Sequence, residues 1–236
     1  MYTRPPQARR SARSNLYSAD KFNNWAHYDP YETEISALPR PLLPAAVVPV
    51  GPGGECPVYE LPLRPAFVRP FTAADVQAAL TAVPPRFLAG LRGVYLLGGT
   101  ARQARACYGD LFRYGCYGSG RVYLHAFPRD LLETYYSHPP RPHLMNDYRR
   151  AGAVWEEVAG GRGWVCRFDY ASLWAFYLRD VLVHEIGHHV DRRNRHKTER
   201  EAERFADWFA RAFGTGRTAG AGGVRGRATF RKRPGG

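Results

Sequence analysis

The sequence His184-Glu185-Ile186-Gly187-His188, which follows the run Leu173-Trp174-Ala175-Phe176-Tyr177-Leu178-Arg179-Asp180-Val181-Leu182-Val183, decides how this chain folds. Residues four apart lie one turn above each other on an α-helix, so the two histidines converge and Glu185 flanks them. The preceding run is almost wholly apolar, which predicts a buried helix with its histidines inside the fold. Two imidazoles and a carboxylate are costly to bury without a partner.

A metal ion is the partner that this cluster favours. Neutral imidazole nitrogens bind zinc at about 2.0–2.1 Å, and a catalytic zinc site has three protein ligands and a fourth position for water. The other interpretation is a polar helix end at which the histidines are solvated or hydrogen-bonded without an ion. Because the helix is expected to be buried, we predict Zn²⁺ with His184 and His188 as ligands.

The sequence after the motif restricts the third ligand. Metzincins have Gly three residues after the second His and a third His three residues later, but Asp191 and Asn194 stand there. Residues 198–210 instead predict a second amphipathic helix, and Glu201 lies at the flank of its apolar face. That face consists of Ala202, Phe205, Ala206, Phe209 and Phe213.

His184-Glu185-x-x-His188 followed by Glu201-Ala202-x-x-Phe205-Ala206 resembles the gluzincins, the zinc peptidases related to thermolysin, and especially their compact minimal forms. The resemblance is strong over residues 172–213 and weaker from Phe71. It implies an α+β fold, in which a small zincin-like mixed sheet packs against the active-site helix and the following helix carries the third ligand. It also implies His184, His188 and Glu201 as ligands and Glu185 as general base.

The identity of the third ligand stays open. Thr198-x-x-Glu201 also fits a capping box, in which Glu201 would bond to the backbone at the helix start. Glu203 has the thermolysin-like Glu-x-x-x-Asp spacing to Asp207, although it lies farther from the apolar centre of the helix than Glu201. Glu201 is therefore preferred to Glu203. The remaining candidates are Glu199 and His196.

The expected activity is peptide-bond hydrolysis, by an endopeptidase rather than an exopeptidase. Zinc lowers the pKa of its bound water to about 7, and Glu185 would accept the proton as the water attacks a carbonyl. The sequence does not single out a residue that stabilises the oxyanion. Asp191 either orients a ligand imidazole or lies in a solvated last turn, and His189 is one position off the ligand face.

The formal net charge of +13 is concentrated at the two ends of the chain. Residues 1–15 carry +4, residues 211–236 carry +7, and residues 16–210 carry only +2. Such ends bind nucleic acid or other polyanions non-specifically, but solubilising, disordered ends are the commoner explanation. The partner expected for the central part is a peptide or protein substrate.

We expect a cytoplasmic protein that does not cross a membrane. No apolar stretch follows the basic residues near Met1, and no run is long enough to span a bilayer. Without an export signal we expect free thiols and not disulfides, and because the chain has no Cys-x-x-Cys pair we expect no cysteine metal site. The four cysteines are Cys56, Cys107, Cys116 and Cys166.

Three regions are expected along the chain. Residues 1–70 are rich in Pro, Arg and Gly and predict an extended or disordered leader, residues 71–213 the folded domain, and residues 214–236 a basic disordered tail. Within the domain we expect a helix that starts at Thr72-x-x-Asp75 and a strand over residues 94–97. Residues 129–160 predict helices broken by prolines 139, 140 and 142.

Two further strands are expected, over residues 120–128 and 164–168. In zincins, a strand at the sheet edge beside the active helix pairs with an extended substrate, and by resemblance either strand could do so. An interior position in a small sheet is the alternative for both.

Two other functional classes remain open. A catalytically silent descendant would keep the zinc site for structure or binding, and a nucleic-acid-associated protein would use its basic tails. Glu185 argues against the first class, because a structural site needs no general base. The location of the charge makes nucleic-acid binding an addition to the expected activity, not a replacement for it.

Overall fold

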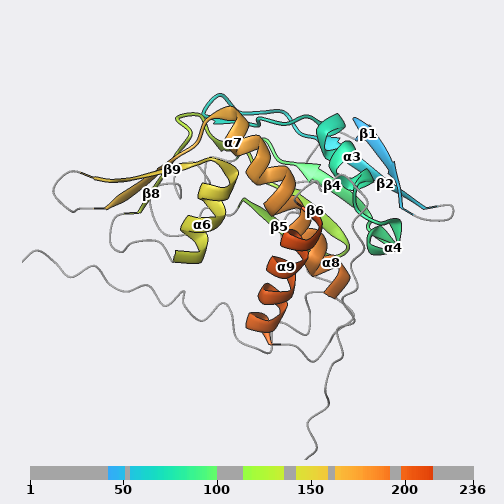
Figure 1. Ribbon diagram of the computed structural model, residues 1–236. Coiled ribbons are helices and arrows are strands. Elements are labelled where there is room, and N and C mark those ends of the chain that lie inside the picture. Colours follow the sequence, from blue (N-terminus) through green and yellow to red (C-terminus); the bar gives the residue numbers. More distant parts are fainter. Residues whose placement is uncertain are drawn as a thin grey trace, which may run out of the picture.

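The computed structural model describes residues 42–50, 54–99, 114–135, 142–158, 163–191 and 198–214. They form a mixed α+β structure (Figure 1). None of the helices in these ranges is both long enough and apolar enough to span a bilayer.

The largest sheet is mixed and has five strands in the order β1-β2-β4-β6-β5. Its three inner strands are parallel to one another, and each edge strand is antiparallel to its neighbour. β5 is therefore an edge strand, and its pairing with β6 runs from Gly115 opposite Leu124 to Gly118 opposite Arg121. The strands are β1 (Ala46–Pro49), β2 (Glu55–Glu60), β4 (Gly93–Leu96), β5 (Gly115–Gly118) and β6 (Arg121–Leu124).

Two smaller sheets accompany it. A three-stranded antiparallel sheet has the order β8-β10-β9, and a two-stranded sheet pairs β3 with β7. Their strands are β3 (Phe67–Val68), β7 (Phe127–Pro128), β8 (Leu132–Tyr135), β9 (Val154–Glu157) and β10 (Trp164–Arg167).

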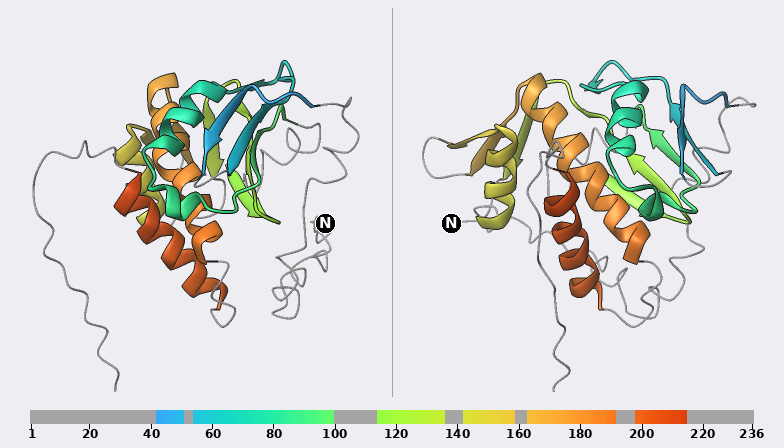
Figure 2. Two further views of the ribbon diagram at one scale, coloured as in Figure 1. Left: turned by 90° about the vertical axis from the view of Figure 1, so that its right-hand side faces the viewer. Right: turned by 45° about the vertical axis from the view of Figure 1, so that its right-hand side comes forward.

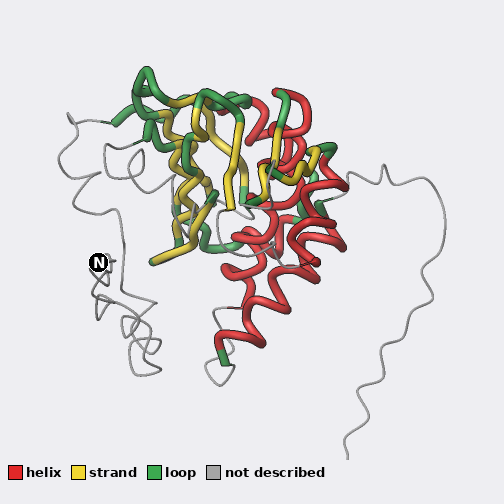
Figure 3. Tube along the Cα trace, turned by 90° about the vertical axis from the view of Figure 1, so that its left-hand side faces the viewer, coloured by secondary structure: helices red, strands yellow, loops and turns green. Residues whose placement is uncertain are grey.

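The helices cover one face of the five-stranded sheet, as the side views show (Figures 2 and 3). α3 packs on β1 and β2, whereas α8 packs on β5 and β6 and separates α9 from the sheet. They are α3 (Ala73–Thr81), α4 (Pro85–Leu88), α6 (Pro142–Ala151), α7 (Tyr170–Ala175), the π-helical turn η1 (Phe176–Val181), α8 (Leu182–Asp191) and α9 (Glu199–Phe213).

Apolar side chains bury both faces of the central strands. Val122 and Leu124 of β6 join the main core beneath the helices. On the opposite face, Tyr123 stacks on Tyr95 at 5.3 Å between ring centroids, and Tyr95 stacks on Tyr59 at 4.8 Å. A strand buried on both faces loses the clean polar alternation of a half-exposed strand.

The expected domain boundary at Phe71 needs correction. Strands β1 and β2 lie within residues 46–60, and β2 pairs with β4 inside the main sheet. The Pro- and Gly-rich segment read as part of a leader is the connection of this β-hairpin, where the Val50 amide donates to the Gly54 carbonyl at 3.0 Å. Residues 1–41 of the expected leader and residues 215–236 of the expected tail lie outside the described residues.

The other expected elements have mixed outcomes. The capping box of Thr72 and Asp75 and the strand at residues 93–96 are confirmed. The expected strand 120–128 is divided between β6 and β7, which belong to different sheets. The helices expected over residues 129–160 are wrong in part, because β8 and β9 flank α6 there.

The helix that carries the histidine motif is continuous but changes its pitch. The side chain of Asp169 caps its start by accepting from the Ser172 amide at 2.6 Å. The chain then passes through α7, η1 and α8 without leaving helical geometry. π-helical turns of this kind are inserted into α-helices frequently at functional sites.

A partly buried acidic group, Glu133, holds the three-stranded sheet to the rest of the molecule. The Glu133 carboxylate on β8 accepts hydrogen bonds from Tyr135, at 2.8 Å, and from Tyr114, which precedes β5. Burial raises the pKa of Glu133, and the hydroxyl donors of Tyr114, Tyr135 and Tyr148 offset part of that rise. The carboxyl therefore binds its proton more tightly in the folded chain than in the unfolded chain.

We predict that Glu133→Gln becomes more stable relative to the parent as the pH rises. A raised folded-state pKa favours folding below the ordinary carboxyl pKa, and this contribution is lost as the pH rises through the raised value. The difference in Tm between variant and parent should shift towards the variant from about pH 4.5 upward. Glu157→Gln, at an exposed position on β9, controls for the loss of a carboxylate. A difference that is constant with pH would contradict the prediction.

Candidate metal centre

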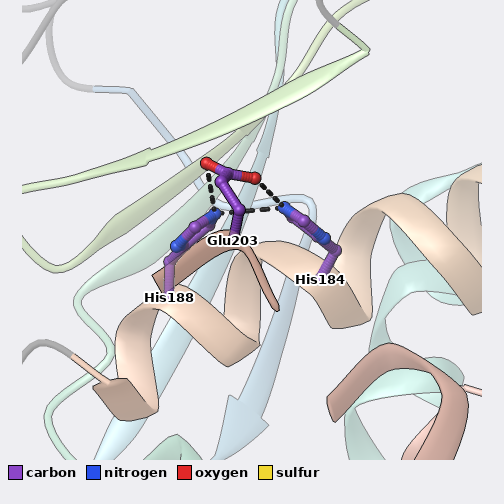
Figure 4. A group of neighbouring side chains, drawn as sticks. All are labelled: His184, His188 and Glu203. Carbon is purple, nitrogen blue, oxygen red and sulfur yellow. Dashed lines mark hydrogen bonds and ion pairs between the residues drawn. The ribbon is translucent and has the colours of Figure 1, made fainter. Parts of the chain in front are cut away.

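Helix α8 brings His184 and His188 together on one face. They are one helical turn apart, and their Nε2 atoms lie 3.0 Å from each other. Figure 4 shows both rings turned towards the same point, with the carboxylate of Glu203 opposite them. Both imidazoles are about one-fifth exposed, so the point at which they converge borders solvent.

Close packing of α9 on α8 brings Glu203 to the histidines. A Cβ atom at Gly187 would lie only 2.7 Å from the Cα of Ala206 on α9, so glycine inside the motif permits this approach. One carboxylate oxygen of Glu203 lies 3.3 Å from His184 Nε2, and the other lies 3.5 Å from His188 Nε2. Among the described residues, His184, His188 and Glu203 form the one such group able to hold a metal ion.

The spacing of these donors fits a tetrahedral ion. Two ligands about 2.0–2.1 Å from a tetrahedral zinc lie roughly 3.3 Å apart. The two nitrogens lie 3.0 Å apart, and each lies 3.3 or 3.5 Å from one of the two oxygens of Glu203, which is close to that value. Two nitrogens and one carboxylate oxygen are also a donor set of catalytic zinc sites, which keep the fourth position open.

Asp207 fixes the orientation of the His184 ring. Its carboxylate lies 3.1 Å from His184 Nδ1, on the side of the ring away from Glu203. A carboxylate only accepts hydrogen bonds, so Nδ1 is the donor and Nε2 is directed at the cluster. The Glu203-x-x-x-Asp207 spacing was the sequence signal for this pair, since it places both carboxylates on one flank of α9.

The pKa of each ionisable side chain in the cluster depends on the charges of the others. Burial disfavours a charged His184, but hydrogen bonds to Asp207 and Glu203 outweigh burial and raise its pKa to about 10. Burial and the adjacent charge of His184 lower the pKa of His188 to about 4. Burial alone would raise the pKa of Glu203, but the His184 hydrogen bond and both histidine charges lower it. A cation bound between these side chains would replace the proton on His184.

The preference for Glu201 as third ligand is corrected by this geometry. Glu201 turns back to the start of α9, where its carboxylate accepts from the Thr198 amide at 2.8 Å and from the Thr198 hydroxyl at 2.9 Å. These contacts complete the capping box. Glu203 replaces it as the candidate ligand. His196 and the side chain of Glu199 lie outside the described residues.

The expected general base, Glu185, is buried between α8 and the edge strand β5. It is 7% exposed. A Cβ atom at Gly115 would lie 3.2 Å from Glu185 Cγ, 3.3 Å from Glu185 Oε1 and 2.8 Å from Val181 Cγ1. The strand can therefore pass so close to Glu185 only because residue 115 lacks a side chain. Sequence reasoning missed Gly115, since no local pattern links it to a residue seventy positions later.

His189 ties the same helix to the same strand and does not join the cluster. It is 2% exposed, with Nδ1 3.2 Å from the Tyr117 hydroxyl and Nε2 3.2 Å from the Ala89 carbonyl. Because a carbonyl only accepts, Nε2 carries the hydrogen and Tyr117 donates to Nδ1. This agrees with the expectation that His189 is a neighbour and not a ligand. Glu185 and His189, one turn apart on α8, thus contact residues two positions apart on β5. Glu185 lies against Gly115, and His189 is hydrogen-bonded to Tyr117.

Asp191 does not lie in a solvated turn. It is 5% exposed, which contradicts that interpretation, and its charge favours protonation of His188. Among the described residues, the carboxylate seen to orient a ligand ring is nevertheless Asp207, through His184.

Neither strand expected to lie at the sheet edge beside the helix with the motif lies at an edge. β6 is an interior strand of the main sheet, and β10 is the central strand of the three-stranded sheet. Both strands expected as possible edges therefore have the interior positions that were the alternative. Among the described strands, the one at the sheet edge beside α8 is β5.

Comparison of this chain with known protein families, with curated proteins and with solved structures found no match.

We predict that Glu203→Gln lowers zinc affinity by more than the 10–100-fold typical of losing a residue that only orients a ligand. Gln cannot supply the negative charge that the ion requires. Glu201→Gln is the matched control on the same helix, because Gln still serves a capping box, and its zinc affinity should equal that of the parent. Chelator competition measures both, and the reverse order of affinities would restore Glu201.

Proposed function

We propose that this chain is a zinc-dependent peptidase, in which His184, His188 and Glu203 hold the ion and Glu185 is the general base. The observation that carries the proposal is the convergence of two imidazole nitrogens, 3.0 Å apart, with the two oxygens of one carboxylate at 3.3 and 3.5 Å from them, beside a buried carboxylate on the same helix as the histidines. A gluzincin-type fold is part of the proposal. The following helix with the third carboxylate and the edge strand next to α8 support it.

Zinc bound at this point would supply a Lewis acid that lowers the pKa of a water molecule to about 7. Glu185 would accept a proton from the attacking water and would give it to the leaving amine as the peptide bond breaks. The close approach of Gly115 holds the Glu185 side chain in place. Asp207 holds the His184 ring with Nε2 directed at the proposed ion site.

The position of β5 in the sheet suggests how a peptide would be held. An extended peptide can add to the edge of a sheet through backbone hydrogen bonds. Among the described strands, β5 lies at the edge of the main sheet and packs against the helix that carries Glu185. Binding along the strand without a requirement for a chain end is the mode of an endopeptidase.

A catalytically silent zinc protein is the competing function. It would keep the three ligands and would have no use for Glu185. The position of Glu185, on the same helix as the histidines and against Gly115 of β5, favours the peptidase, because a zinc site used only for binding needs no general base. A cytoplasmic location remains a prediction from the sequence.

We predict that Glu185→Gln keeps zinc bound while hydrolysis falls by about 10²–10⁴-fold, since Gln keeps the shape of the side chain but cannot accept the proton. Metal content by mass spectrometry and cleavage of an unbiased peptide library measure the two effects. His184→Ala is the control for metal loss, because two ligands do not complete a tetrahedral site. A parent protein that binds zinc and cleaves no peptide would favour the silent zinc protein.

We also predict that Gly115→Ala separates metal binding from catalysis. The added methyl group would meet Val181 and Glu185, and would displace the base without touching a ligand. A misplacement of about 1 Å costs roughly 10²-fold in rate, so kcat should fall while zinc affinity is unchanged. Cys116→Ala changes the next residue of β5 on the opposite face and should keep the parent kcat. Equal kcat in the Gly115 variant and the parent would remove Gly115 from the mechanism.

A further inference from the structure

The outer face of α9 carries a row of exposed side chains, three arginines and one tryptophan. Arg200, Arg204 and Trp208 are each four residues apart, and Arg211 follows three residues later, so neighbours in the row lie one turn apart. All four are exposed. At 1.5 Å per residue the row extends over roughly 16 Å. α8 lies between α9 and the sheet, so α9 is an outer helix of the molecule (Figure 2).

Three acidic side chains of α9 have partners outside the row. Glu203 and Asp207 are engaged with the histidines of the metal centre, and Glu201 is engaged with Thr198. Within the described ranges, Arg200 and Arg204 make no ion pair. A helix with several glutamates would usually pair them with arginines three or four residues away. On α9 these carboxylates contact the histidines and Thr198 instead.

Arg211 makes only a weak ion pair. Its guanidinium lies 3.8 Å from Asp147, a carboxylate that already pairs with Arg150 at 3.0 Å. An exposed pair at that separation contributes little to stability. Arg211 is therefore available to an anionic partner.

Trp208 is the aromatic member of the row. It is 56% exposed, and its inner edge packs on Phe205, at 5.6 Å between ring centroids, and on Phe209 and Phe213. The packing fixes the ring without covering it. A rigid, half-exposed indole between arginines is a platform on which another flat ring can stack.

The charge of the surrounding sequence has the same sign. Residues 192–236 contain thirteen Lys and Arg and four Asp and Glu, a net charge of +9 out of +13 for the chain. α9 contributes −1 to this total, and three of its four acids are the engaged side chains described above. An anionic chain would be attracted towards this part of the molecule.

We propose that the outer face of α9 binds single-stranded nucleic acid, with Arg200, Arg204 and Arg211 on phosphates and Trp208 stacked on an unpaired base. Charge alone would fit any polyanion, but the fixed indole favours a partner with accessible aromatic rings. A base inside a duplex is already stacked on its neighbours, so a single strand is the better occupant. This inference goes beyond the proposed peptidase and does not depend on zinc.

The test is binding of a fluorescein-labelled oligothymidylate to the full chain, followed by anisotropy and by quenching of tryptophan fluorescence. Trp208→Leu keeps the packing on Phe205 and Phe209 but cannot stack, so its affinity should fall by about 5-fold to 100-fold. Arg200→Ala and Arg204→Ala should each reduce the slope of log K against log salt by about 0.7. Tyr170→Leu and Arg64→Ala are matched controls, because Tyr170 is also 56% exposed and Arg64 is exposed.

Parent affinity in both the Trp208 and the Arg204 variants would overturn the proposal, since the charge of the flanking sequence would then be sufficient. Tighter binding of a duplex of the same length would also overturn it. So would equal competition by poly-glutamate, which would mark the surface as one for acidic peptides. Measurements on the Glu203→Gln variant distinguish this proposal from the peptidase, because that variant should lose zinc and keep the oligonucleotide.

Discussion

The close contact of α8 and α9 at Gly187 and Ala206 is the constraint on which the candidate site depends. Any side chain at residue 187 would separate the helices, because even a methyl group there would meet the backbone of α9. At this separation Glu203 reaches both histidines and Asp207 reaches the far side of the His184 ring. The middle of the motif is thus as important for assembling the ligands as the histidines themselves.

Two independent surfaces of α8 meet at the proposed catalytic centre. One surface faces α9 and holds the side chains that would bind the ion, and the other faces β5 and holds Glu185 against Gly115. His189 belongs to the second surface through Tyr117, although it directly follows a ligand in the sequence. A helix between a second helix and a sheet edge can therefore set the ligands and the base by different contacts.

The sequence predicted what depends on local spacing and missed what depends on distant contacts. The two histidines, the buried helix, the second helix and the Thr198 capping box all follow from residues a few positions apart. Glu201 was preferred to Glu203 because it lies nearer the apolar face, yet a ligand must leave that face to reach side chains at the border of the contact. The interior positions of β6 and β10, and the role of β5, arise from strand order. Strand order is a property of the whole sheet, which no local pattern encodes.

The short sequence distance between the ligands separates two events in folding. His184, His188, Glu203 and Asp207 lie within twenty-four residues of one another, whereas Gly115 is seventy positions from Glu185. Local contacts form faster than long-range ones, because less chain must be closed into a loop. The helix pair could therefore capture an ion before β5 joins the sheet, and a bound ion would then stabilise the pair during the slower steps. Metal content would consequently report the formation of a helical hairpin, and only the environment of Glu185 would report completion of the native fold.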